Sequence, residues 1–301
     1  MGRLMAVTIP LRGSVSPKEI GLEVWMDRVL ERIERVRGGW DADEVHDLRV
    51  ALRRCRSMAD ALTEVNPGPG WRKLRKASRG LFQALGELRD TQVERGWVKK
   101  IGPAGDSVRR RLLRSLAFQE KALRQKAEKA VGRFDRKAWR KLTRKQGPKA
   151  QFFPLESVVF QRLALSRLNT AAKLFEKART RRSRVAWHQL RIGIKNFRYV
   201  VENFLPQRSA AWGNDLRRMQ DLLGDVHDLD VLRLRIRSAA SKLDPTGVAE
   251  WVKKIDAQRK VCLQEFLRLS SGPDSRWLTW RAGLQAGHWL MAAASLARLT
   301  A

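Results

Sequence analysis

The sequence is poor in cysteine, in acidic residues and in long apolar runs. Among its 301 residues are two cysteines, Cys55 and Cys262, which stand far apart and outside any Cys-x-x-Cys or Cys/His spacing. We therefore expect neither a disulfide framework nor a zinc site, and no cofactor. The most apolar C-terminal run, residues 277–296, is interrupted by Arg281 and His288, and the N-terminus has no apolar stretch long enough for a signal peptide. These absences predict a cytoplasmic protein that does not enter a membrane.

Acidic residues are outnumbered two to one. The chain has 62 Lys+Arg against 31 Asp+Glu, a formal charge of +31, and residues 101–200 alone carry an excess of +21. Such a charge argues against an ordinary enzyme of small neutral substrates and favours a polyanionic partner: nucleic acid, an anionic membrane or polyphosphate. Because 43% of the residues are hydrophobic, the chain can still bury a core and is not a disordered basic tail.

Alternating strand patterns are absent as well, and helical periodicity runs through nearly the whole chain, so the predicted class is all-α. A capping box at residues 16–19 begins the first predicted helix, and Gly147-Pro148 ends the first half of the chain. The other predicted helices lie at about 43–65, 70–100, 106–145 with Gly132 as a candidate break, 155–180, 183–205, 208–223, 227–243, 246–270 and 274–299.

Two motifs occur twice, in the same order. The segment from His46 to Arg56 aligns with the segment that begins at His188, at an offset of 142 residues. Leu85-Gly-Glu-Leu-Arg-Asp90 aligns with Leu223-Gly-Asp-Val-His-Asp228, at an offset of 138. Because both motifs recur in the same order, the sequence predicts two similar helical halves, residues 1–147 and 148–301. The duplication also suggests a pseudo-twofold arrangement of these halves.

The first motif places basic side chains beside a core stripe. At about 100° per residue, its four basic or potentially basic groups share a helix face about 80° wide, and the second copy repeats the face. Such a face is usually solvated surface, and a single histidine there is usually structural, but duplication favours a binding role. The two faces consist of His46, Arg49, Arg53 and Arg56, and of His188, Arg191, Lys195 and Arg198.

The second motif has a more structural interpretation. Gly86 and Gly224 suit close helix packing or a bend, and Asp90 and Asp228 suit the orientation of an Arg or His from the first motif. Further basic side chains occupy equivalent stretches of the two halves and are weaker candidates for ligand contact. They are Arg75, Arg79, Arg217 and Arg218.

Both motifs resemble those of the CHAD family, the conserved histidine α-helical domain. The resemblance covers most of the chain and implies two antiparallel four-helix bundles around a basic central groove or pore that binds inorganic polyphosphate, in a protein found on polyphosphate granules. Asn196 departs from the pattern because it stands where the first copy has Arg54. The resemblance implies that the ligand contacts are His46, Arg49, Arg53, Arg56, His188, Arg191, Lys195 and Arg198, with Arg54, Arg89 and His227 as weaker candidates.

Two other functions compete with polyphosphate binding. Nucleic-acid binding shares the electrostatics, but the sequence has no helix-turn-helix, zinc-finger or RNA-binding signature. A metal-dependent phosphohydrolase would use the His46-Asp47 and His227-Asp228 pairs, yet a metal site needs further ligands and the chain has four histidines. We therefore expect a stand-alone binding module rather than an enzyme.

Overall fold

In the computed structural model, residues 21–285 are described, and all their regular structure is helical. This confirms the all-α class. The helices are α2 (Leu22–Gly38), α3 (Ala42–Val65), α4 (Pro69–Ile101), α5 (Ser107–Gly132), α6 (Arg136–Gln151), α7 (Val158–Arg181), α8 (Arg184–Phe204), α9 (Pro206–Ser238), the short 3-10 turn η1 (Ala240–Lys242) and α10 (Pro245–Ser270). Residues 276–285 are helical too.

Helix starts follow local capping chemistry. The Asp41 carboxylate accepts hydrogen bonds from the backbone N–H groups of Asp43 and Glu44 at 2.9 and 3.0 Å, which satisfies free donors at the start of α3. Asp106 and Asp135 cap α5 and α6 in the same way. The capping box predicted at residues 16–19 lies outside the described residues.

Two predicted helix boundaries are wrong. The helices expected at 208–223 and 227–243 form one helix, α9, which runs through Gly224. A helical glycine costs about 1 kcal/mol, but Leu223 and Val226 are buried on either side, so packing holds the helix together. Helix α6 continues past Gly147-Pro148 to Gln151, because Gln146 and Gly147 are buried.

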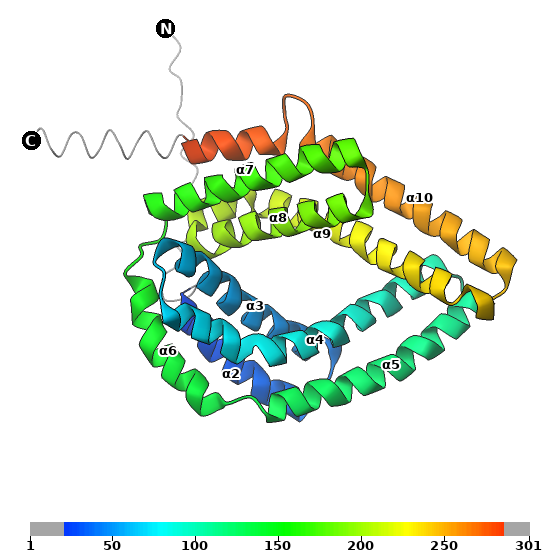
Figure 1. Cartoon of the computed structure of the whole chain (residues 1–301), viewed down its shortest axis with the longest axis horizontal. Coiled ribbons are helices and arrows are strands. Elements are labelled where there is room, and N and C mark those ends of the chain that lie inside the picture. Colours follow the sequence, from blue (N-terminus) through cyan, green and yellow to red (C-terminus); the bar gives the residue numbers. More distant parts are fainter. Residues whose placement is uncertain (1–20, 286–301) are drawn as a thin grey trace, which may run out of the picture.

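The helices of both halves pack on one continuous core. Helices α2, α3, α4 and α6 pack on one another, as do α7, α8 and α9, and the two groups meet where α3 contacts α8 and α4 contacts α9 (Figure 1). A second core joins the far ends of α4 and α9 with α5 and α10, around Trp251. The twofold relation of the halves and their division at residue 147 stay predictions. The two copies of the first motif lie on α3 and α8, so the contact between these helices brings the copies together.

Candidate functional site: a central basic cluster

The duplicated motifs lie on α3 and α8, the two helices that meet between the halves. Their predicted core stripes are confirmed, since Leu48 and Leu52 on α3 and Leu190 and Ile194 on α8 are fully buried. With these stripes held in the core, the neighbouring basic faces lie at the border between the halves. The site is therefore positioned by hydrophobic packing of the same two helices that carry it.

Arg49 is the best-defined cation of the first face. Its guanidinium lies 4.0 Å from the Asp90 carboxylate and 4.9 Å from the ring centroid of Phe82, both on α4. Gly86 makes this position possible, because a Cβ atom there would lie 3.1 Å from the Arg49 Nη1. Asp90 and Gly86 thus perform the orienting and close-packing roles predicted for the second motif in the first half. At Gly224 a Cβ atom would meet nothing within 4 Å, so the second copy has no such close contact.

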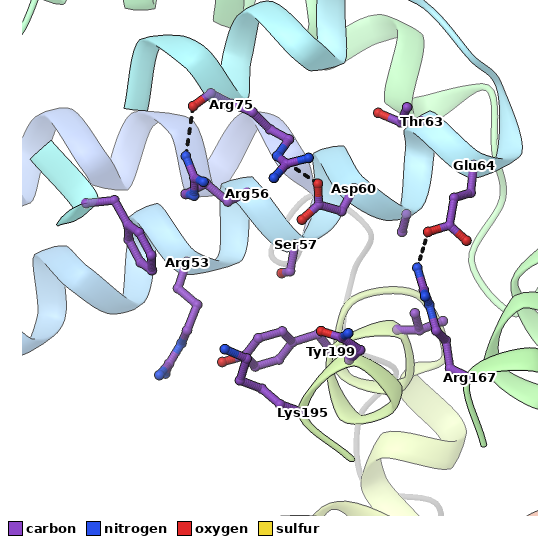
Figure 2. Close-up of a pocket in the computed structure, with 14 residues that line it drawn as sticks. Arg53, Arg56, Ser57, Asp60, Thr63, Glu64, Arg75, Arg167, Lys195 and Tyr199 are labelled. Carbon is purple, nitrogen blue, oxygen red and sulfur yellow. Dashed lines mark hydrogen bonds and ion pairs between the residues drawn. The ribbon is translucent and has the colours of Figure 1, made fainter. Parts of the chain in front are cut away.

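Cations from the two halves converge at Lys195. Burial, followed by repulsion from Arg191 on its own helix and from Arg53 and Arg49 on α3, lowers the pKa of Lys195 to about 8. Repulsion from Arg53 and Arg191 likewise contributes to the lowered pKa of Arg49, after burial. Figure 2 shows Arg53 from α3 and Lys195 and Tyr199 from α8 reaching into the space between the two helices, with Arg53 at 5.6 Å from the Tyr199 ring centroid.

Two histidines pair at the α8–α9 contact. The Nδ1 atoms of His188 and His227 lie 3.3 Å apart, so one neutral ring donates its proton and the other accepts it. Burial, followed by the charge of Arg191, lowers the pKa of His227 to about 4 and also lowers that of His188. The neighbouring Asp228 has its pKa raised by burial to about 7, although Arg191 opposes this.

His46 is in a similar environment on α3, where burial lowers its pKa and the charges of Arg89, Arg53 and Arg49 contribute. The structure therefore brings eight of the predicted residues into one set of mutually interacting groups. We call this set the central cluster. Its members are His46, Arg49, Arg53, Arg89, His188, Arg191, Lys195 and His227.

Arg54 and Arg198 belong to a different network. Both pair with the buried carboxylate of Glu202, at 2.8 and 2.6 Å, and Arg54 also donates to Asn203 at 2.7 Å. Asn203 in turn donates to Ser57 on α3. The contacts of Arg54 and Ser57 tie α3 to α8, whereas Arg198 pairs with Glu202 within α8, so neither arginine is a free cation.

Replacing Glu202 by glutamine should lower the free energy of unfolding by about 2 kcal/mol, because the two partly buried arginines lose their only shared carboxylate. Urea unfolding measures this. The matched control is Glu176→Gln, which breaks the exposed pair with Arg179 and should leave the midpoint unchanged. Equal effects of the two substitutions would contradict a structural role for Glu202.

The remaining predicted residues lie around the cluster or apart from it. Arg56 donates to the Arg75 carbonyl at 2.8 Å and to Ser78 at 3.1 Å, and Arg75 pairs with Asp60. Arg79 is exposed near Arg56. Arg217 donates to Asn214 and Arg218 pairs with Glu265 on α10, so neither contributes a contact to the central cluster.

A cleft of about 450 Å³ opens beside the cluster. Arg53, Lys195 and Tyr199 line it (Figure 2), and so does Phe82. Sequence reasoning selected neither Tyr199 nor Phe82, although Phe82 lies four residues before Gly86 and so on the same face of the helix. Its two acids are already paired, Asp60 with Arg75 and Glu64 with Arg167. The cleft can therefore offer net positive charge and aromatic surface to an anionic chain.

Among residues 21–285, no group of three or more His, Cys, Asp or Glu side chains is placed to hold a metal ion. No helix within the same range is long and apolar enough to cross a membrane.

Comparisons with known proteins agree on one family. Residues 22–237 match the CHAD domain. The crystal structure of the CHAD domain from the plant Ricinus communis is similar in fold, with a TM-score of 0.56 and 22% sequence identity over 88% of this chain and 89% of that chain. A search of curated proteins finds no match. The residues that match the CHAD domain include both copies of the two repeated motifs.

Proposed function

The chain belongs to the CHAD domain family, and from that premise we propose that it binds inorganic polyphosphate along the central cluster and the adjacent cleft. The observation that carries the proposal is the convergence of cations from both halves on Lys195. Like charges that are brought together with few acidic partners destabilise the free protein. A linear polyanion that passes between α3 and α8 would relieve this repulsion.

The chemistry of the cluster suits phosphate groups in series. Arginine forks bind phosphate oxygens with two hydrogen bonds, and lysine adds a mobile point charge. Arg49 and Arg53 lie on one side of the proposed path and Arg191 and Lys195 on the other, so successive phosphates would have partners on both helices. Many modest contacts along one polymer give an affinity that rises with chain length and falls with salt.

Competition binding tests this proposal. Labelled long-chain polyphosphate is bound to the protein, and unlabelled polyphosphate, duplex DNA or RNA is added at equal phosphate concentration. We expect only polyphosphate to displace the label efficiently, because the cations lie beside a cleft rather than on a surface that fits a wide duplex. Equal displacement by DNA or RNA would contradict the proposal and favour a nucleic-acid-binding protein.

We also propose that the protein binds polyphosphate without hydrolysing it and collects on polyphosphate granules. A phosphohydrolase would use His227, whose ring pairs with that of His188 and which precedes Asp228 in the chain. Metal-dependent release of orthophosphate that is lost in a His227→Ala variant would overturn the binding-only function. A fluorescent fusion that stays diffuse in cells rich in granules would contradict the localisation.

Substitutions at Gly86 and Gly224, which are equivalent in the repeated motif, test whether the position of Arg49 matters for binding. Gly86→Leu should weaken polyphosphate binding about tenfold, because the new side chain displaces the Arg49 guanidinium, whereas Gly224→Leu should leave binding unchanged, since its Cβ would meet nothing within 4 Å. Both substitutions replace a helical glycine by a better helix former, so neither should reduce helicity. Titration calorimetry and circular dichroism measure the two effects. Equal weakening by both would show that Arg49 is not held in place by the close approach at Gly86.

A further inference from the structure

A second basic pocket lies away from the central cluster. It has a volume of about 640 Å³ and opens between the loop and first turn of α4, residues 66–71, and one face of α6. Helix α6 runs along the outer edge of the first half (Figure 1). None of the residues that line this α4–α6 pocket lines the cleft beside the central cluster. The two are separate places on the molecule.

Four lysines line the α4–α6 pocket without an acidic partner. Lys141, Lys145 and Lys149 follow one another at intervals of four along α6, and Lys73 faces them from α4. No acidic residue lines the pocket, and none of the four makes an ion pair with any residue in the range 21–285. Lysines four residues apart on a helix repel one another, so their grouping costs free energy that an anion would recover.

The start of α4 adds to this positive potential. Its N-cap is Gly68, no side chain caps it, and its first turn has no acidic residue, while Arg72 and Lys73 follow directly after Trp71. Cations are unfavourable at a helix N-terminus, where unpaired backbone N–H groups already carry partial positive charge. The 33-residue helix therefore directs free donors to the same place as the lysines.

A buried amide lies at the back of the pocket. Gln146 is 2% exposed and lines the pocket, yet its side-chain amide makes no hydrogen bond with the described part of the chain. Gly70 leaves room for it, because a Cβ atom at Gly70 would lie 2.3 Å from the amide oxygen. The amide can therefore bond to a polar ligand in the pocket without giving up a bond to the protein.

We infer that the α4–α6 pocket is a second anion site, which binds a compact phosphoryl anion of two or three linked phosphate groups. Lysine ammonium groups and helix N–H groups both bind phosphate oxygens, and the amide of Gln146 can donate to one more. The pocket is larger than a single phosphate needs, and its lining also includes Pro67, Trp71 and Leu142. The anion can therefore be a free oligophosphate or the phosphate tail of a nucleotide. The inference does not rest on what the central cluster binds.

Lysine footprinting on the full chain tests the site residue by residue. The protein is acetylated with and without tripolyphosphate or ATP, and the rate at each lysine is followed by mass spectrometry. We expect Lys73, Lys141, Lys145 and Lys149 to react at least fivefold more slowly with either compound, while the exposed Lys253 and Lys254 on α10 keep their rates. Stronger protection by ATP would assign the site to nucleotides, and stronger protection by tripolyphosphate to free oligophosphate. Protection by neither, or equal protection of the α10 lysines, would overturn the inference.

Charge-reversal variants separate this site from the central cluster. In a chain that already carries Arg49→Glu and Arg191→Glu, we expect tripolyphosphate binding to remain measurable by calorimetry. Adding Lys141→Glu and Lys145→Glu should then weaken it at least tenfold, whereas adding Lys253→Glu and Lys254→Glu should change it less than twofold. Equal effects of the two pairs would overturn the inference. If the central variants keep full affinity for long polyphosphate while the lysines remain protected, the proposed function fails and the second site stands.

Discussion

Reversing the charges of Arg49 and Arg191 together should weaken binding of long-chain polyphosphate by about a thousandfold. Each arginine provides charge-assisted hydrogen bonds worth about 1.5–3 kcal/mol, and each substituted glutamate adds repulsion, so a combined loss of about 4 kcal/mol is expected. Because the two residues lie on α3 and α8, they flank the proposed path from opposite sides. Their charges also repel each other in the free protein. Titration calorimetry at fixed salt measures the loss.

The control variant reverses two positive charges that lie outside the central cluster. Lys129 and Arg133, at the end of α5, are exposed and make no ion pair within the described part of the chain. Reversing both should weaken binding less than tenfold, because they contribute only to the diffuse field of the protein. Circular dichroism establishes that both double variants are folded. Equal losses would mean that polyphosphate responds to total charge and has no defined path.

Lowering the pH from 7 to 5 should tighten polyphosphate binding by about a hundredfold. In the free protein the pKa of His227 is about 4, so this ring is neutral in this range, and burial shifts the pKa of His188 in the same direction. A phosphate beside them favours the charged ring and raises the pKa, so binding takes up protons; each proton taken up tightens binding by up to tenfold per pH unit. Asp228, with a pKa of about 7, loses its negative charge as the pH falls and acts in the same direction.

Above pH 7 the affinity for polyphosphate should also fall as the pH rises. Lys195 has a pKa of about 8 in the free protein, so it loses its charge above pH 8 and binding should weaken further. Titrations between pH 5 and 9 in two buffers of different ionisation enthalpy give both the affinity and the number of protons taken up. A His188→Gln, His227→Gln variant should lose most of the dependence between pH 5 and 7. An unchanged slope would show that these rings do not face the ligand.

The helical class and the two basic faces could be predicted because both depend on local spacing. Periodicity places Leu48 and Leu52 on the buried side of α3 whatever its neighbours are, and the side chains beside them follow from helix geometry. The wrong break at Gly224 shows the limit of local signals. A glycine weakens a helix by about 1 kcal/mol, and buried neighbours on either side offset that amount.

Which cations remain free could not be predicted. Arg53 and Arg54 are adjacent in the sequence, but Arg54 meets Glu202 and Asn203 of the other half, while Arg53 reaches the cleft. The partners are nearly 150 residues apart in the chain, so the pairing depends on how α3 docks on α8. The α4–α6 pocket could not be predicted for the same reason, since its lysines come from two helices.

The excess of basic over acidic residues can be read from the sequence, but the positions of these charges in space cannot. Composition, periodicity and the repeated motifs predict a helical chain of two similar halves that binds a polyanion, because charge and helix register are properties of nearby residues. Only the packed structure decides that eight of the predicted groups converge, that Arg54 and Arg198 both pair with Glu202, and that four lysines gather elsewhere. Electrostatic interaction depends on distance through space, and between distant segments that distance is set by the tertiary fold.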